Sequence, residues 1–324
     1  MVAKIKNKIF NGKNLLILAV IGLIALFIAK SDVYVKTTYR GVLVWGTAVL
    51  PSLLPFFFLT ALVTKTGNVV KLSEKLTPVS KFLYNADGVS LYIRLTSLIS
   101  GYPVGAKLIC DLYKSGKITA RQAEKYCTFT STSGPLFIIG AVAIGAYGNK
   151  YYGFIMLLSH VLSSCLVGVI FRKMSDNGLI APLFQKDDCD NVLYESMFSA
   201  VSSVLLVGGF VAVFFTVSEM VNDLKLLYPL QKFLSLFLDE KLAEGFSLGL
   251  IECTKGTVML AKASKGKLSC ALSCALISFG GLSVWFQSLT YLKTAKVRVF
   301  IFAAAKVLHT IIAFLLCYIL LSLL

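Results

Sequence analysis

Long apolar runs alternate with short polar segments rich in lysine along most of the chain. Seven of these runs approach or exceed the length of about 20 residues that a helix needs to cross a membrane. They cover residues 15–29, 40–64, 126–147, 151–171, 194–219, 268–290 and 299–322. Backbone polar groups must be paired inside a membrane, so these runs are expected to be helical. The pattern predicts an all-α polytopic membrane protein with about seven spans.

Two further apolar stretches are interrupted at their centres. Residues 88–116 contain the letters SGYPVG at 100–105, and residues 243–264 contain ECTKG at 252–256. Neither half of either stretch is long enough to cross a membrane alone. Non-helical backbone at that depth persists only where protein or water surrounds it. We therefore expect two re-entrant hairpins whose tips reach the middle of the membrane.

Composition agrees with this class of protein. The 324 residues are 57% hydrophobic and 15% charged, with a mean hydropathy of +0.79. A soluble domain carries about 25% charged residues. The net charge of +16 would suit nucleic-acid binding if it formed one basic face, but the basic residues flank the apolar runs instead. The lipid bilayer is therefore an expected partner, and nucleic acid is not.

The basic residues are divided unequally by the predicted spans. With a cytoplasmic N-terminus, 18 fall on the cytoplasmic side and nine on the outer side, as the positive-inside rule requires. Residues 1–39 are expected to form a basic segment and an uncleaved first anchor, because a small-residue cleavage pattern is missing around Ala29. The remaining basic residues fall within hairpins or spans: Arg94, Lys107, Lys255, Lys262 and Lys306.

Cysteine and histidine usage gives no sign of a metal site. The chain has eight cysteines and two histidines, and no two cysteines have CxxC spacing. Zinc sites and disulfide frameworks depend on such spacing. No metal and no cofactor is therefore expected, and the cysteines are interpreted as small apolar side chains within helices.

Short motifs recur in the same order in the two halves of the chain. KFL stands at 81–83 and 232–234, GKIT at 116–119 is followed by GKLS at 266–269, and His160 has its counterpart in His309. The offsets between matching motifs stay between 147 and 152 residues. This order and spacing predict an internal duplication.

The duplicated units are expected at 40–175 and 194–324, with a polar loop at 176–193 between them. Each unit holds one span, an interfacial amphipathic helix, a hairpin and two further spans. Three crossings are an odd number, so the second unit must be inverted relative to the first. Inverted repeats with broken helices are the architecture of many secondary transporters, whose sites lie between the repeats.

The hairpin tips and the segment 128–142, which contains TSTSGP, are the strongest local features. Pro103 and Pro135 suit the first turn of a helix, and Ser133 is a favourable N-cap. Half-helices that begin in mid-membrane direct N–H groups and positive dipole ends at a common space, which favours an anion. The predicted substrate-binding residues are Ser100, Gly101, Tyr102, Pro103, Lys107, Thr130, Ser131, Thr132, Ser133, Gly134, Pro135, Lys255, Gly256, Gly280 and Gly281. The alternative is that these small residues only let helices approach closely.

Ionisable residues within apolar segments are further candidates, because their burial is costly. Lys107 and Lys255 are expected to neutralise a carboxylate, although Lys107 would also reach the membrane surface. Glu252 is interpreted as a site for a coupling cation or proton, or else as the partner of Lys255. His160 and His309 would act as a proton relay or as helix-bonding side chains.

Enzyme activity is not expected. Ser133 with His160 or His309 offers the residue types of an intramembrane serine protease, but no oxyanion-hole signature and no third group accompany them. A P-loop or dinucleotide fingerprint is also missing, so nucleotide-driven transport is not expected.

Several of these motifs resemble a known family. SGYPVGAKL, FTSTSGPLFIIGAVAIG, SHVLSSCLVG and LPSLLPFFFL are similar to the sporulation integral membrane proteins of the YlbJ family of spore-forming Firmicutes. The resemblance covers about residues 38–322, and the second unit departs more, with ECTKG where the first has SGYPVG.

The resemblance implies a Gate, or nucleoside-recognition, type of membrane domain, similar in layout to concentrative nucleoside transporters. It also implies placement in the outer forespore membrane, derived from the mother cell, and a link to dipicolinic acid. The expected function is alternating-access transport of a small organic anion, dipicolinic acid, which is the expected solute partner. Transport of a nucleoside or other small solute, and a non-transporting scaffold for spore-envelope assembly, are the alternatives; homo-oligomerisation is left open.

Overall fold

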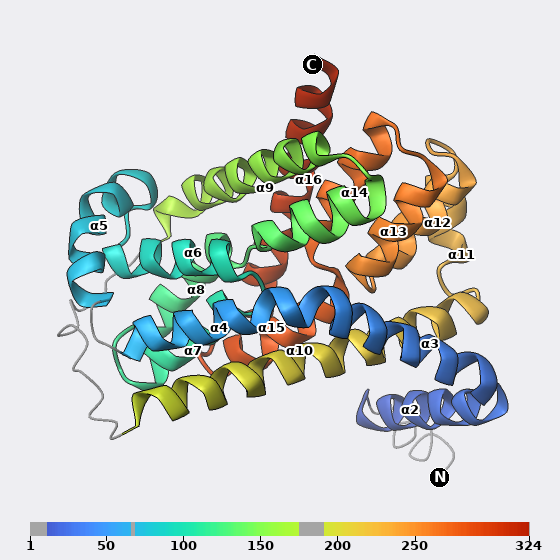
Figure 1. Cartoon of the computed structure of the whole chain (residues 1–324), viewed down its shortest axis with the longest axis horizontal. Coiled ribbons are helices and arrows are strands. Elements are labelled where there is room, and N and C mark those ends of the chain that lie inside the picture. The colour runs from blue at the N-terminus through green and yellow to red at the C-terminus, as the bar shows by residue number, and fades with distance from the viewer. Residues whose placement is uncertain (1–11, 66–68, 175–190, 324) are drawn as a thin grey trace, which may run out of the picture.

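A computed structural model describes residues 12–65, 69–174 and 191–323. These residues form α-helices with short π- and 3-10-helical segments, and they contain no strand, which confirms the all-α prediction (Figure 1). Most of the predicted polar loop at 176–193 lies outside the described residues, as does the basic segment before Gly12. The boundaries of the two predicted units stay a prediction.

The N-terminal part consists of α2 (Gly12–Ala29), α3 (Ser31–Val44), the π-helical η1 (Trp45–Val49) and α4 (Leu50–Lys65). The chain bends by 102° between α2 and α3, and α2 lies at the edge of the molecule in Figure 1. Its apolar side chains are exposed, with Ile28 at 70%. This exposure suits the membrane anchor expected here.

The first half continues through α5 (Val69–Tyr84), α6 (Gly88–Ser100), α7 (Val104–Lys114), α8 (Ala120–Thr130), the π-helical η2 (Leu136–Tyr147), α9 (Lys150–Ile170) and the short η3 (Phe171–Lys173). Side-chain caps explain several of the starts. Asp87 accepts from Ser90 N at the start of α6, and Thr119 forms a capping box with Gln122 at the start of α8. Asn149 caps α9 in the same way, which satisfies amides that a helix leaves unpaired.

The second half follows the same order of elements. It contains α10 (Val192–Asp223), α11 (Tyr228–Leu234), α12 (Glu240–Gly249), α13 (Cys253–Ala263), α14 (Lys267–Phe279), α15 (Gly281–Leu292) and α16 (Val299–Leu323). The pair α12–α13 corresponds to α6–α7, and α14–α15–α16 corresponds to α8–η2–α9. The inversion of the second half stays a prediction.

Four helical stretches among the described residues are long and apolar enough to cross a membrane, or five if α2 and α3 form one bent span. The sequence pattern predicted about seven spans. The difference arises because two predicted spans are divided in the structure. Residues 126–147 are split between α8 and η2, and residues 40–64 pass through α3, η1 and α4.

The helices α3 and α4 lie along α10 in the antiparallel direction (Figure 1). Three hydrogen-bonded pairs establish this direction, because the residue numbers rise along α3 and η1 while those of their partners fall along α10. Lys30 Nζ donates to Asp223 at 3.0 Å, Thr38 and Thr216 share a hydrogen bond of 2.6 Å, and Trp45 Nε1 donates to the Val204 carbonyl at 3.1 Å.

Residues assigned to one side of the membrane by the sequence pattern meet in the structure. Arg298 binds Glu124 through its Nε at 2.7 Å, Nη2 at 2.9 Å and backbone N at 2.9 Å. At the opposite side, Tyr152 donates to the carbonyl of Lys265 at 3.0 Å. The grouping of the loops into two sides is therefore consistent with the predicted crossings, and the cytoplasmic position of the N-terminus stays a prediction.

Candidate functional site

Four interruptions of the helices meet near the centre of the molecule. Tip 1 (residues 101–103) joins α6 to α7, and tip 2 (residues 250–252) joins α12 to α13. Break 1 (residues 131–135) separates α8 from η2, and break 2 (Gly280) separates α14 from α15. Each tip packs against the break in its own half. The two pairs meet where the Tyr102 hydroxyl of tip 1 donates to the carbonyl of Ile277, near break 2.

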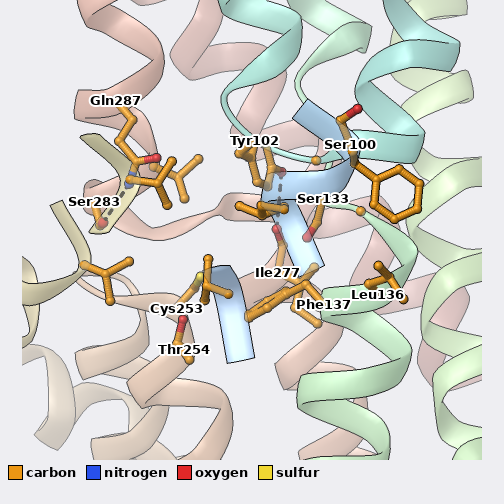
Figure 2. Close-up of a pocket in the computed structure, with 18 of the residues that line it drawn as sticks. Ser100, Tyr102, Ser133, Leu136, Phe137, Cys253, Thr254, Ile277, Ser283 and Gln287 are labelled. Carbon is orange, nitrogen blue, oxygen red and sulfur yellow. Dashed lines mark hydrogen bonds between the residues drawn. The ribbon is translucent and has the colours of Figure 1, made fainter. Parts of the chain in front are cut away.

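The central cavity lies among these tips and breaks, and about 730 Å³ of empty space, part of it open to the surroundings, lies between its lining residues. Figure 2 shows Ser100, Tyr102, Ser133, Cys253 and Ile277 around it. Apolar side chains of η1, α4 and α10 complete the wall: Val49, Leu53, Phe56, Val207 and Val211. A mostly apolar cavity with a few polar groups is typical of a site for a small organic molecule.

Tip 1 and break 1 approach each other so closely that both need glycine. Gly101 has φ of +80°, and a Cβ added there would lie 2.9 Å from Gly134 N. A Cβ on Gly134 would lie 3.2 Å from the carbonyl oxygen of Ile99. Only glycine combines the positive φ with this close backbone contact.

The backbone carbonyls of tip 2 accept hydrogen bonds from the amides at the start of α15. Leu282 N donates to the Leu250 carbonyl at 2.8 Å, and Ser283 N donates to the Ile251 carbonyl at 3.1 Å. The expectation that this half-helix directs free N–H groups into a common space is wrong for these two amides, because the carbonyls of tip 2 already accept from them. Gly281 has φ of +70°, and a Cβ there would lie 3.0 Å from Cys253 N.

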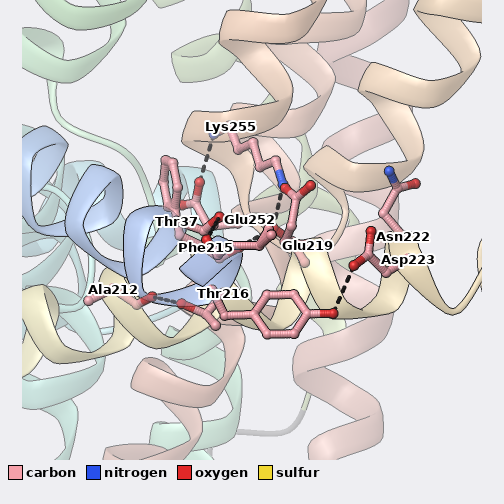
Figure 3. A network of polar contacts seen from close by, with 12 residues as sticks. Thr37, Ala212, Phe215, Thr216, Glu219, Asn222, Asp223, Glu252 and Lys255 are labelled. Carbon is pink, nitrogen blue, oxygen red and sulfur yellow. Dashed lines mark hydrogen bonds and ion pairs between the residues drawn. The ribbon is translucent and has the colours of Figure 1, made fainter. Parts of the chain in front are cut away.

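Glu252 is buried at the end of tip 2 and caps α13. Its carboxylate accepts from the backbone N of Lys255 at 2.7 Å, which satisfies a free amide of the first turn. The ammonium of Lys255 turns the other way, to Glu219 at 2.6 Å and Ser218 at 3.1 Å (Figure 3). The charged partner of Lys255 is therefore Glu219, and the ion pair with Glu252 that the sequence offered as an alternative is not formed.

His160 joins the two breaks. Its Nε2 accepts from Ser133 N at 3.0 Å, and its Nδ1 lies 2.8 Å from Ser278 Oγ. Because an amide only donates, Nε2 carries no proton, and the neutral ring then donates from Nδ1 to Ser278. One side chain thus connects break 1 with the end of α14.

His309 lies against His160, with ring centroids 4.6 Å apart. Its Nε2 is 3.0 Å from the carbonyl oxygen of His160, which only accepts, so His309 donates there. These contacts agree with the helix-bonding interpretation of both histidines, and the proton relay stays a prediction.

Lys306 is buried in α16, with 2% of its surface exposed. Its Nζ donates to the hydroxyl of Tyr102 at 2.6 Å and to the carbonyl of Ser131 at 3.4 Å. The Tyr102 hydroxyl in turn lies 3.3 Å from the carbonyl of Ile277, to which it donates. This lysine therefore ties tip 1 and break 1 to the second half of the chain.

The structure brings some of the predicted site residues to the cavity and leaves others away from it. Those that line it are Ser100, Gly101, Tyr102, Ser133, Gly134 and Glu252. Those that do not are Pro103, Lys107, Thr130, Ser131, Thr132, Pro135, Lys255, Gly256, Gly280, Gly281, His160 and His309. Among the described residues, every Lys and Arg is outside the cavity wall.

Other lining residues were not predicted. Thr254 follows tip 2, and Ser283 and Gln287 lie one turn apart on α15, where Gln287 Nε2 donates to Ser283 Oγ at 3.3 Å. The spacing of these two polar residues in an apolar run is a signal that would have shown them on one helix face. Cys253 carried no such signal. Within the described part of the chain, no group of three or more His, Cys, Asp or Glu is placed to hold a metal ion.

Comparison with known proteins extends over both hairpins. No family model matches the sequence. The chain is 28% identical over 319 residues to the sporulation integral membrane protein YlbJ of Bacillus subtilis (strain 168), which covers 90% of this chain and 78% of that protein. The comparison supports the YlbJ family.

The extent of the match bears on the site. Only a tenth of the chain lies outside the aligned region. The segment before the first hairpin and the segment after the second are each longer than a tenth of the chain. A continuous alignment with the YlbJ protein therefore includes both tips and both breaks. Together with the long apolar helices, the similarity supports a multi-pass integral membrane protein.

Proposed function

We propose that this chain is a sporulation membrane transporter or facilitator. It would move a small organic anion, dipicolinic acid, from the mother cell across the outer forespore membrane by alternating access. The YlbJ similarity supports a membrane role in sporulation. The central cavity, which both tips and both breaks surround, is the observation that carries the transport proposal.

The position of the cavity suits alternating access. Its wall combines elements of both halves, as sites of inverted-repeat transporters do. Polar contacts join the halves beside it, among them Tyr102 to Ile277, His160 to Ser278 and Lys306 to Ser131. Rearrangement of these contacts would open the cavity to one side and then to the other.

The cavity chemistry suits a flat aromatic dianion such as dipicolinate. Phe56 and Phe137 offer apolar surface to a ring, while Ser100 and Ser133 offer hydroxyls to carboxylates. Lys306 lies behind Tyr102 and supplies a positive charge without entering the wall. Hydrogen bonds to charged groups are stronger than neutral ones, so a few such donors would hold the solute.

Uptake into liposomes tests the proposal directly. Purified full-length protein should carry dipicolinate into proteoliposomes, and Ser133→Leu, which fills the cavity, should reduce uptake to about a tenth or less. Ser322→Leu is the matched control because Ser322 is exposed near the end of α16, and its uptake should stay normal.

Spore chemistry provides the second test. In a spore-forming host whose own gene is deleted, the wild-type chain and Ser322→Leu should restore dipicolinate content, and Ser133→Leu should not. Normal content in the deletion strain itself would exclude dipicolinate as the solute. Competition by uridine in the liposome assay would favour a nucleoside, and protein that transports neither solute would favour the scaffold. We propose no catalytic step.

A further inference from the structure

A second cavity lies on the other side of tip 1. About 590 Å³ of empty space, part of it open to the surroundings, lies between its lining residues. Its polar lining consists of Thr60 on α4, Lys107 and Asp111 on α7, and Ser199 and Ser203 on α10. We call it the access chamber, and neither the sequence motifs nor the family resemblance assigns a role to it.

The access chamber and the central cavity are neighbours. On each of three elements, one residue lines the central cavity and a nearby residue lines the chamber. On α4 these residues are Phe56 and Phe57, and at tip 1 they are Tyr102 and Pro103. On α10, Val207 lines the central cavity and Ser203, one turn earlier, lines the chamber. The two spaces therefore lie next to each other along α4, α10 and tip 1.

A side-chain hydrogen bond joins α4 to the end of α6 at the boundary between the two cavities. Thr60 lines the chamber, Ser100 lines the central cavity, and their hydroxyl oxygens are 2.9 Å apart. Ser100 is the last residue of α6, directly before the non-helical backbone of tip 1. The contact thus ties the end of α6, where tip 1 begins, to α4.

The chamber holds a basic group inside and an acidic group outside. Lys107 is half-buried, and its ammonium donates to Ser203 Oγ at 3.1 Å and also to Ser199 Oγ. Asp111 is exposed one turn farther from tip 1. A carboxylate that passes Asp111 would find an ammonium and two hydroxyls in one place, which is a favourable set of donors for it.

We propose that the access chamber is the route by which a carboxylate-bearing solute reaches the central cavity. Lys107, Ser199 and Ser203 form its first binding subsite, and the hydrogen bond between Thr60 and Ser100 closes the way inward. This inference rests on the proposed function for the identity of the solute. The route itself rests on the two cavities and the contact between them.

Cysteine modification tests the route without any need for transport. Ala61→Cys places a thiol in the chamber, and the native Cys253 reports on the central cavity. Full-length protein is treated with a negatively or a positively charged methanethiosulfonate, and mass spectrometry measures the rate at each cysteine. Rates are divided by those of a free thiol to remove intrinsic differences between the reagents.

The anionic reagent should modify Ala61→Cys about tenfold faster than the cationic one, because a local positive charge concentrates anions. Lys107→Gln in the same background should remove this preference, and Lys107→Arg should keep it. If Lys107→Gln fails to fold, dipicolinate should still slow modification of Ala61→Cys in protein that retains Lys107. The subsite would be excluded if Ala61→Cys did not react. It would also be excluded if the ratio of anionic to cationic rates were the same in Lys107→Gln as in protein that retains Lys107.

Thr60→Val tests the closing contact, since valine keeps the shape and loses the hydroxyl. Modification of Cys253 should rise about fivefold, as expected when one hydrogen bond across a closed contact is lost, while Ala61→Cys should react as before. An unchanged rate of modification at Cys253 would show that the hydrogen bond between Thr60 and Ser100 does not close the way inward. If the chamber behaves as proposed while liposome uptake fails, the route stands and the transport proposal falls.

Discussion

Lys306 Nζ lies 2.6 Å from the hydroxyl oxygen of Tyr102, although 204 positions separate the two residues in the chain. The pair joins the last helix of the chain to the first hairpin tip. A buried ammonium that loses a partner is left with an uncompensated desolvation penalty, whereas replacing the ammonium itself removes that penalty. This asymmetry leads to the first prediction.

Tyr102→Phe should destabilise the protein more than Lys306→Met does. Phenylalanine keeps the ring under the Lys306 ammonium, which lies 4.4 Å from the ring centroid, but removes the hydroxyl and leaves the Ser131 carbonyl, at 3.4 Å, as the acceptor. This loss should lower the free energy of unfolding by about 1–3 kcal/mol. Lys306→Met should be close to neutral in stability but should lower dipicolinate uptake. Thermal unfolding in detergent, followed by the fluorescence of Trp45 and Trp285, measures the difference. Equal stability of Tyr102→Phe and wild type would contradict this account.

His160→Leu should destabilise the protein more than His309→Leu. His160 accepts from Ser133 N and binds Ser278, so leucine leaves a buried amide without its acceptor, at a cost of about 1–3 kcal/mol. His309→Leu removes only the donor to a carbonyl. The unfolding temperatures of the two variants provide the comparison, and the reverse order would show that the ring contact matters more than the hydrogen bonds.

Gly101→Ala should destabilise the protein by about 1–3 kcal/mol, because alanine would combine a positive φ with a contact of 2.9 Å to Gly134 N. Gly209→Ala is the control, since a Cβ there meets nothing within 4 Å in the middle of α10. Alanine in a helix should raise stability by up to about 1 kcal/mol. If both variants lost a similar free energy of unfolding, the backbone at tip 1 would not require glycine.

The contact between Glu124 and Arg298 should make stability depend on acid pH. Hydrogen bonds from Arg298 outweigh burial and hold the pKa of the Glu124 carboxyl below its ordinary value of 4.5. A lowered pKa in the folded state contributes stability that is fully present above about pH 4.5 and is lost as the pH falls through the lower folded value.

Arg298→Ala should change this pH dependence. The buried Glu124 carboxylate would lose its partner, so the decline in unfolding temperature should begin at a higher pH than in the wild type. Lys293→Ala is the control because Lys293 is an exposed residue of the same loop. Identical pH profiles for Arg298→Ala and Lys293→Ala would show that the ion pair does not set the dependence.

The interruptions of the helices could be predicted because their causes are local. SGYPVG, TSTSGP and the glycine pair at 280–281 carry proline or glycine within apolar runs, and these residues end helices through their own backbone geometry. The two sides of the molecule could also be grouped, since basic residues cluster between the apolar runs. Tip 1 and both breaks follow from such signals. The second hairpin is interrupted at 250–252, before most of the predicted segment 252–256, because residues 253–256 already belong to α13.

The partners of the buried charges could not be predicted, because they depend on packing between distant helices. Lys306 finds Tyr102, and Lys255 finds Glu219 instead of the nearby Glu252. The sequence also gave no means to see that tip 2 would accept from the first amides of α15. The spacing of Ser283 and Gln287 places them on one face of a helix, but it does not show that this face lines the cavity.

The two hydrogen bonds of His160 have a consequence for how the halves are held together. Separation of break 1 from the end of α14 would break the bond to Ser133 or the bond to Ser278. Each is worth about 1 kcal/mol, and 1.4 kcal/mol changes the ratio of two states about tenfold. The side chain at position 160 is therefore one link that holds break 1 against the end of α14, and a substitution there weakens the attachment of both segments at once.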